Sequence, residues 1–313
     1  MKPLRSDEIR GNWATALLPI AENDDIDYGR LAEEIDVLIG MGVDGIYSNG
    51  TAGEFHNQTE EEFDRVNALL AERCNAAGTP FQIGVSHMSP RLSLERLRRA
   101  VALEPGAVQV ILPDWLPVKD AEAIAFLNRM GEEARPIGLV LYNPPHAKRA
   151  LAPEEIGRLA EAAPALVGVK VADGDAAWYR AMARHAGRLS LFVPGHRLAT
   201  GFALGAHGSY SNMACLHPGA AQRWFERIKS DYEAALELEG RIRQFMDGCI
   251  IPLAAQQGFS DPALDKLLAA IGGWANIGTR LRWPYRSVPE TEVSRLRPIA
   301  ERALPEFFPR PCP

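Results

Sequence analysis

Short, almost wholly apolar runs alternate along this chain with longer amphipathic segments. An apolar run bounded by turn residues is typical of a parallel strand buried on both faces, and a three-to-four-residue apolar repeat is typical of a helix. The pattern predicts eight strands, at Ala14–Leu18, Gly45–Ser48, Phe81–Val85, Val108–Leu112, Ile137–Tyr142, Leu166–Lys170, Ser190–Val193 and Gly208–Ser211. It predicts a helix after each strand, at Tyr28–Met41, Glu60–Ala76, Ser89–Leu103, Ala121–Glu133, Pro153–Ala162, Ala176–His185, Arg197–Leu204 and Pro218–Lys229.

Eight strand–helix units within about 230 residues match an α/β fold, the (β/α)8 TIM barrel, in number, order and length. A doubly wound sheet is the alternative, but the first strand runs into Leu18–Ile20 without the Gly-rich turn that such sheets normally carry. We therefore predict a catalytic barrel over residues 1–230. Residues 231–313 predict a C-terminal helical extension, packed on the barrel or against another subunit, with helices near Tyr232–Gln256, Pro262–Ile271 and Glu290–Ala303.

The composition describes a globular protein, with 313 residues, 47% hydrophobic, 24% charged, and a formal net charge of -6. A mildly acidic chain without a basic run does not favour nucleic acid or anionic membranes, and no run approaches the ~20 apolar residues that span a bilayer. The start at Met1–Asp7 lacks the apolar segment of a signal peptide, so we expect a cytoplasmic protein. The four cysteines, Cys74, Cys215, Cys249 and Cys312, have no metal-like or framework-like spacing, which predicts reduced thiols, no disulfide and no structural zinc.

The apolar run Leu166–Lys170 ends in a lysine, and this residue is the first candidate for chemistry. Burial disfavours the ammonium form and can lower the pKa of a lysine by several units from ~10.4. A neutral amine attacks carbonyl carbons, and the usual product is a Schiff base. The alternative is a lysine that merely ends the strand and extends its amine into solvent.

Other polar residues also follow the predicted strands, at the end of a barrel where active sites lie. The second strand leads into Gly50–Glu54, a turn whose backbone N–H groups could cradle a carboxylate. The fifth strand ends in Tyr142, and neighbouring strands lie about 4.8 Å apart, so Tyr142 and Lys170 can point into the same space. A phenol beside an amine is a proton-transfer pair. Taken singly, each feature could be an ordinary glycine turn or strand end.

The sequence resembles the dihydrodipicolinate synthase / N-acetylneuraminate lyase family of class I, pyruvate-dependent aldolases. Three motifs carry the resemblance in matching order and spacing: Gly50–Glu54, Tyr142–Pro145 and Gly168–Lys170. The resemblance implies a (β/α)8 barrel with a C-terminal helical extension, assembled as a homo-oligomer, either a dimer or a homotetramer. It implies these roles: Lys170 as Schiff-base nucleophile, Tyr142 as acid/base, Thr51 as proton relay, and Gly50, Ala52 and Tyr210 as substrate-binding residues.

The chain departs from the lysine-pathway enzymes of this family at three positions. Ala52 replaces the second hydroxyl of the turn, and Trp115 stands where a relay tyrosine is expected. An indole N–H donates a hydrogen bond but cannot shuttle a proton. Ala147 stands where an arginine would hold a carboxylate, and whether the adjacent Lys148 or Arg149 reaches the pocket is open. We therefore expect poor use of aspartate semialdehyde, with Trp115 as a substrate-binding residue, as in hydratase-aldolases that take aromatic-substituted pyruvates.

The combined reading is a cofactor-independent, Schiff-base-forming lyase that acts on pyruvate or another 2-oxo acid together with an aldehyde. An alternative within the family is dehydration of a 2-keto-3-deoxy sugar acid. A different class is a catalytically silent barrel that binds a 2-oxo acid or serves only in an assembly, but retention of both Lys170 and Tyr142 argues against it. His196 and His207, near the last two strands, could enter the pocket or remain solvated loop residues.

Overall fold

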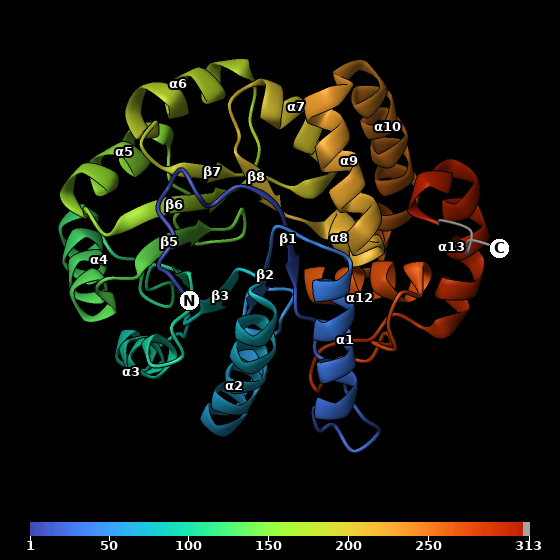
Figure 1. The fold of residues 1–313 in the computed structure, drawn as a ribbon, viewed down its shortest axis with the longest axis horizontal. Coiled ribbons are helices and arrows are strands. Elements are labelled where there is room, and N and C mark those ends of the chain that lie inside the picture. Colours follow the sequence, from blue (N-terminus) through green and yellow to red (C-terminus); the bar gives the residue numbers. More distant parts are fainter. Residues whose placement is uncertain (309–313) are drawn as a thin grey trace.

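The computed structural model describes residues 1–308, and its core is a closed barrel of eight parallel strands in chain order (Figure 1). In the ladder that closes the barrel, Gly11 of the first strand lies opposite Gly208 of the last. The (β/α)8 architecture predicted from the sequence is confirmed. The strands are β1 Gly11–Thr15, β2 Gly45–Ser48, β3 Phe81–Gly84, β4 Ala107–Val110, β5 Gly138–Asn143, β6 Leu166–Val171, β7 Ser190–Phe192 and β8 Gly208–Tyr210.

An outer ring of helices surrounds the strands, and several begin at the capping residues that the sequence provides (Figure 1). Thr59 accepts from the N–H of Glu62, whose side chain accepts in turn from Thr59 N–H, which makes a capping box. Asp175 accepts from the N–H of Trp178 and starts the helix that follows β6. The ring contains α1 Tyr28–Gly40, α2 Glu60–Ala77, α3 Pro90–Val101, α4 Asp120–Ala134, α5 Pro153–Ala162, α6 Ala176–Ala186, α7 Leu198–Ala203, α8 Asn212–Leu216 and α9 Pro218–Ser230.

Three elements differ from the sequence prediction, and one of them is the short helix α8, which the sequence does not predict between β8 and α9. The first strand ends at Thr15 instead of Leu18, because Leu17 N–H donates to the buried Glu34 side chain (2.7 Å) and not to a neighbouring strand. The single helix predicted from Tyr232 to Gln256 is α10 Tyr232–Phe245, a π-helical turn at Met246–Ile250, and α11 Ile251–Gln257. Pro252 has no backbone N–H and cannot donate a helical hydrogen bond. The apolar repeat, from which the single helix is predicted, contains no information on this missing donor.

An aromatic cluster fills the barrel interior. The Tyr210 ring lies 4.7 Å from the Tyr47 ring, 4.6 Å from Phe192 and 5.9 Å from Trp13, measured between centroids. The Tyr210 hydroxyl donates to Gln82 Oε1 at 2.8 Å, so the buried phenol has a partner. This cluster forms a rigid, mostly apolar floor for whatever binds above it.

The C-terminal helices pack on the barrel, as one of the two predicted arrangements requires. They are α10, α11, α12 Asp261–Gly272 and α13 Glu290–Ala303, and they gather beside α8 and α9 (Figure 1). Helix α12 packs against α8, and α10 packs against α9 and α7. From residue 231 to residue 308 the structure has no strand, as predicted. Helix α12 thereby reaches the end of the barrel where β6 ends.

The described residues show no helix with the length and apolar character that a membrane span requires. Cys74 and Cys215 are buried free thiols, and Cys249 is a half-buried one. Among residues 1–308, no three His, Cys, Asp or Glu side chains are grouped as ligands of a metal ion. Cys312 lies outside the described residues.

Candidate active site

Lys170 lies at the end of β6 among three tyrosine rings. Its Nζ is 4.2 Å from the ring centroid of Tyr142 and 5.3 Å from those of Tyr47 and Tyr210. In the β5–β6 ladder, Tyr142 is the register partner of Lys170, which places both side chains at the same level. Aromatic rings replace much of the water around the amine, and this burial lowers the pKa of Lys170 to about 8. About a tenth of the amine is therefore unprotonated and nucleophilic at pH 7, far more than for a lysine with its ordinary pKa.

Tyr142 and Thr51 form the second part of the site. The Tyr142 hydroxyl and Thr51 Oγ1 are 3.2 Å apart, which is a hydrogen bond in which either oxygen can donate. Burial raises the pKa of Tyr142 to about 12, against the opposing effect of the hydrogen bond from Thr51. The phenol is therefore protonated near neutral pH and can give a proton before it takes one. The structure thus brings together the three residues for which the sequence predicted catalytic roles.

The turn that carries Thr51 is held in a demanding backbone conformation. Asn49 and Glu54 have positive φ angles of 55° and 51°, in the left-handed region. A Cβ on Gly53 would lie 2.9 Å from the backbone nitrogen of Asn49, so a larger residue does not fit there. The Gln58 amide donates to Asn49 Oδ1 (3.0 Å) and to Gly53 O (2.9 Å), which ties the two ends of the turn together.

A buried ion pair connects this turn to the C-terminal helices. Lys266 Nζ of α12 lies 2.5 Å from Glu54 Oε1 and donates to the Arg280 carbonyl at 2.6 Å. Both charged residues are buried, at 0% and 1% exposure. Burial lowers the pKa of Lys266 and raises the pKa of Glu54, while each charge opposes the shift of the other. Sequence reasoning missed this contact, whose only signal is a lysine within the apolar pattern of Pro262–Ile271.

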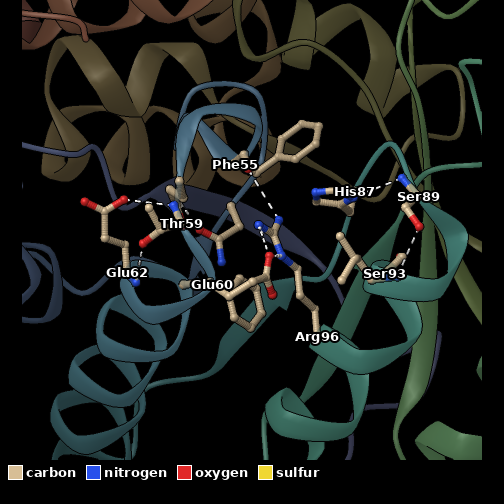
Figure 2. A network of polar contacts seen from close by, with 12 residues as sticks. Phe55, Thr59, Glu60, Glu62, His87, Ser89, Ser93 and Arg96 are labelled. Atoms are coloured by element: carbon tan, nitrogen blue, oxygen red, sulfur yellow. Dashed lines mark hydrogen bonds and ion pairs between the residues drawn. The ribbon is translucent and has the colours of Figure 1, made fainter.

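A network of polar contacts supports the segment after the turn (Figure 2). Arg96 of α3 is only 1% exposed, and its guanidinium donates to Glu60 Oε1 (2.9 Å) and to the carbonyls of Ser86 (2.8 Å) and Phe55 (3.4 Å). Figure 2 shows these groups converging from α2, α3 and the loop that follows Gly50–Glu54. Because one guanidinium satisfies acceptors on three segments, it fixes the position of Phe55 next to the site.

A cavity of about 320 Å³ opens above the lysine. Five of the seven predicted site residues line it: Thr51, Ala52, Tyr142, Lys170 and Tyr210. The remaining polar wall comes from the loop after β7, from α8 and from α12: His196, Asn212, Cys215, Asp261 and Asp265. A second cavity of about 130 Å³ shares Thr51 and Tyr142 and is mainly apolar, with Phe55, Met88, Ile111, Leu112 and Val118 in its lining. Thr51 and Tyr142 thus line two cavities, of which the larger one also contains the charged groups Lys170, Asp261 and Asp265.

The two other predicted residues lie differently. Gly50 is the buried first residue of the turn, and an added Cβ there would lie 2.7 Å from the Tyr47 ring. Trp115 is 74% exposed and is not in the lining of either cavity. Lys148 covers its ring, with Nζ 4.8 Å from the ring centroid and donating to the Trp115 carbonyl at 3.0 Å. Substrate contact by Gly50 or Trp115 therefore stays a prediction.

Arg149 lines the smaller cavity, but its guanidinium is already engaged. It donates to Glu155 Oε1 (2.7 Å) and to the Val118 carbonyl (2.7 Å), and it is paired with Asp120. These acidic partners raise the pKa of Arg149 and lower those of Asp120 and Glu155. Such a paired guanidinium is poorly placed to replace the arginine that is missing at Ala147.

Of the two histidines left open by the sequence, one reaches the site. His196 lines the larger cavity, and its Nδ1 lies 3.0 Å from Asn212 Nδ2. His207 precedes β8, so it lies at the opposite, amino-terminal end of the barrel, where its Nδ1 accepts from Leu191 N–H at 3.0 Å. Burial lowers the pKa of both imidazoles, which favours the neutral form.

Asp265 is the acidic residue that sequence reasoning missed. It lies half-buried on α12, lines the larger cavity, and shares that lining with Lys170. Burial, reinforced by the Asp261 charge, raises the pKa of Asp265 to about 7, and Lys170 opposes this rise. The available sequence signal is weak: Asp261 and Asp265 are spaced i, i+4, which places them on one face of an otherwise apolar helix.

Comparison with known proteins agrees with this fold. Residues 8–302 match the model of the dihydrodipicolinate synthetase family, and the chain belongs to that family. It is 31% identical over 239 residues to a 4-hydroxy-tetrahydrodipicolinate synthase of Exiguobacterium sp., covering 75% of this chain and 80% of that protein. It is 26% identical over 317 residues to the trans-O-hydroxybenzylidenepyruvate hydratase-aldolase of Sphingobium xenophagum, covering 95% and 93%.

Solved structures show the same architecture. The chain superimposes with a TM-score of 0.83 on YagE of E. coli K12, a protein of the dihydrodipicolinic acid synthase family crystallised with pyruvate. The match covers 94% of this chain and 98% of that one at 19% identity, so it supports the fold alone. Together with the family match, the curated relatives make this protein an enzyme of the lyase and aldolase kind.

Proposed function

We propose that this protein is a Schiff-base-forming lyase of the class I aldolase type, acting on pyruvate or another 2-oxo acid together with an aldehyde. The observation that carries the proposal is Lys170: burial lowers the pKa of its amine to about 8, and the amine faces the Tyr142 ring at 4.2 Å. The Tyr142–Thr51 hydrogen bond supplies a proton donor beside it. The two named relatives support the reaction class, since one is a synthase and the other a hydratase-aldolase.

In the proposed mechanism, the neutral Lys170 amine attacks the ketone carbon of the 2-oxo acid. The ketone oxygen takes one proton from the attacking amine and a second from Tyr142, which is protonated because its pKa is about 12; the oxygen then leaves as water and a protonated imine forms. The imine withdraws electrons, so either a C3 proton or the C3–C4 bond is lost and an enamine results. The phenolate recovers its proton with Thr51 as relay, 3.2 Å away.

The direction of the second half-reaction depends on what meets the enamine. In synthesis, C3 of the enamine attacks an aldehyde carbon, the aldehyde oxygen takes a proton, and water then releases the product from Lys170. In cleavage, these steps run in reverse. The same enamine can instead expel a hydroxyl group at C4, so dehydration of a 2-keto-3-deoxy sugar acid is the alternative within the family. The similarity to a hydratase-aldolase supports this alternative.

The Gly50–Glu54 turn is the proposed holder of the 2-oxo acid carboxylate. Thr51 and Ala52 line the cavity next to Lys170. Backbone N–H groups of a tight turn can bind a carboxylate without any side-chain hydroxyl, so the alanine at position 52 leaves this role intact. The rigid support from Gln58 and Lys266 keeps the turn in place before the substrate arrives.

Three further properties remain predictions that accompany this function. The chain is expected to form a homodimer or homotetramer, which sedimentation analysis of the purified protein would measure. The boundary between barrel and extension is predicted near residue 230, and the protein is expected in the cytoplasm.

Borohydride trapping tests the proposed function. After incubation with pyruvate and reduction, we expect one reduced adduct per chain, located at Lys170 by peptide mapping. The Lys170→Ala variant should form none, whereas Lys148→Ala, which removes an exposed lysine outside both cavity linings, should be labelled like the wild type. Labelling of Lys148 or Lys266 with Lys170 untouched would contradict the mechanism. Binding of pyruvate without any adduct would favour a catalytically silent barrel.

A further inference from the structure

The larger cavity has an acidic wall that the proposed reaction does not use. Helix α12 contributes Asp261 and Asp265 to its lining. Lys170 is the one lysine in the lining formed by the described residues, and no arginine lines it. Once Lys170 has formed an imine with a 2-oxo acid, its charge is matched by that substrate's own carboxylate. A second carboxylate entering the cavity would therefore meet no free cation.

From this arrangement, we infer that Asp265 is a specificity-determining residue that selects a neutral, hydroxyl-bearing aldehyde and excludes aldehydes with a carboxylate of their own. The inference rests on the proposed function, because it assumes that the aldehyde enters the cavity above Lys170. Asp265 accepts hydrogen bonds from hydroxyl groups of the aldehyde, and its negative charge repels an anionic one.

The surroundings of Asp265 leave it free for this role. Its carboxylate interacts with the Cys215 thiol of α8, and a thiol is a weak donor. Burial raises the pKa of Cys215, so that thiol stays neutral and adds no competing charge. On the same wall, His196 and Asn212 are paired with each other. Asn212 Nδ2 lies 3.0 Å from the ring nitrogen Nδ1 of His196, and Asn212 Oδ1 accepts from the backbone N–H of His196 at 3.1 Å.

The selection should depend on pH, because Asp265 changes charge within the range of ordinary assays. Its pKa of about 7 means that the carboxyl is largely neutral at pH 6 and largely ionised at pH 8. Exclusion of an anionic aldehyde should therefore strengthen as the pH rises. Seven other titratable side chains line the same cavity: Lys170, Tyr47, Tyr142, Tyr210, His196, Cys215 and Asp261.

Lys170 titrates nearby, with a pKa of about 8, but its effect cancels in a comparison of two aldehydes. Both aldehydes react with the same enamine on Lys170. The pH dependence of imine formation therefore cancels in the ratio of their kcat/KM values. What remains is the pH dependence of aldehyde binding and of its reaction with the enamine.

The test uses two four-carbon aldehydes, neutral D-erythrose and anionic succinic semialdehyde, each with saturating pyruvate between pH 6 and pH 8.5. For the wild type, we expect kcat/KM to favour D-erythrose, with a ratio that rises through pH 7. In Asp265→Asn, the ratio should fall roughly tenfold, the order expected for losing a charge-assisted contact, and its pH dependence should disappear. Glu237→Gln is the control, because it removes one exposed negative charge of α10 that lines neither cavity, and it should change the ratio by less than about threefold.

Several results would overturn the inference. They are a wild-type preference for succinic semialdehyde, a wild-type ratio that is flat with pH, no turnover of D-erythrose, and an unchanged ratio in Asp265→Asn. If thermal unfolding shows that Asp265→Asn does not fold, the same ratio is measured for Asp265→Ser, and the pH dependence of the wild-type ratio provides the second test of the inference. Borohydride trapping with pyruvate alone separates the two proposals. If the wild type forms no adduct at Lys170, the proposed function is wrong. If the adduct forms normally but one of these overturning results is observed, only the role of Asp265 is wrong.

Discussion

The buried pair between Lys266 and Glu54 connects the C-terminal helices to the turn that carries Thr51, and its removal should lower the stability of the protein. Lys266 Nζ lies 2.5 Å from Glu54 Oε1, and both residues are buried. Replacing Lys266 with Met leaves a buried carboxylate without its partner, and replacing Glu54 with Gln leaves a buried ammonium. Glu54 also closes the turn that carries Thr51, so each change should disturb catalysis as well as stability.

The magnitude follows from the desolvation of both charges. Breaking one side of a buried ion pair costs about 3–5 kcal/mol, because the remaining charge stays out of water without compensation. For a chain of this size, 1 kcal/mol corresponds to about 2 °C in Tm, so each single variant should melt roughly 6–10 °C lower. In the double variant Glu54→Gln/Lys266→Met neither charge remains, so the loss should be smaller than the sum of the two single losses by about 1–3 kcal/mol.

Thermal and denaturant unfolding of the four proteins measures this coupling. Lys229→Met serves as the control, since Lys229 pairs with Glu226 at 3.0 Å on the surface, where such a pair contributes about 0–1 kcal/mol. The pyruvate trapping rate, measured on the same variants, should fall for the single variants because the Thr51 turn loses its support. Single losses below 1 kcal/mol, or a double variant whose loss equals the sum, would refute the reasoning.

The remaining predictions concern the chemistry. Tyr142→Phe should keep the fold and lower kcat by about 10²–10⁴-fold, the usual contribution of a positioned acid/base, and steady-state kinetics showing a near-normal rate would assign proton transfer elsewhere. The rate of imine formation at low pyruvate should rise with pH and level off above about pH 8, because burial lowers the pKa of Lys170 and only the neutral amine attacks; trapping rates that inflect near the ordinary lysine value of 10.5 would contradict this. Aspartate semialdehyde should be a poor acceptor, because Ala147 removes a charge-assisted hold and Arg149 is already paired; a measured kcat/KM near 10⁴ M⁻¹s⁻¹ or above would show that this interpretation is wrong.

The barrel and the lysine–tyrosine pair could be predicted from the sequence because both depend on local regularities. Apolar runs and the helices between them give strand order, and parallel neighbours place Tyr142 and Lys170 at the same level, which the register confirms. The role of Thr51 beside Tyr142 is implied by the family resemblance of the Gly50–Glu54 turn, and the structure has the two hydroxyls 3.2 Å apart.

The residues contributed by the C-terminal helices could not be predicted in this way. Asp265 and Lys266 are adjacent in sequence, yet the first lines the cavity and the second contacts the Thr51 turn. Their directions depend on how α12 packs against α8, and no periodic pattern encodes that packing. Trp115 shows the same limit. The sequence indicates that this residue follows the fourth strand, but the direction of its side chain depends on the fold, and the side chain is 74% exposed.

The most direct measurement is a crystal structure of the protein after pyruvate soaking and borohydride reduction. The account predicts continuous density between Lys170 Nζ and the former ketone carbon of pyruvate, with the carboxylate at the Thr51–Ala52 backbone and the Tyr142 hydroxyl beside the new bond. Pyruvate bound without a covalent link to Lys170, or linked to another lysine, would contradict the central claim.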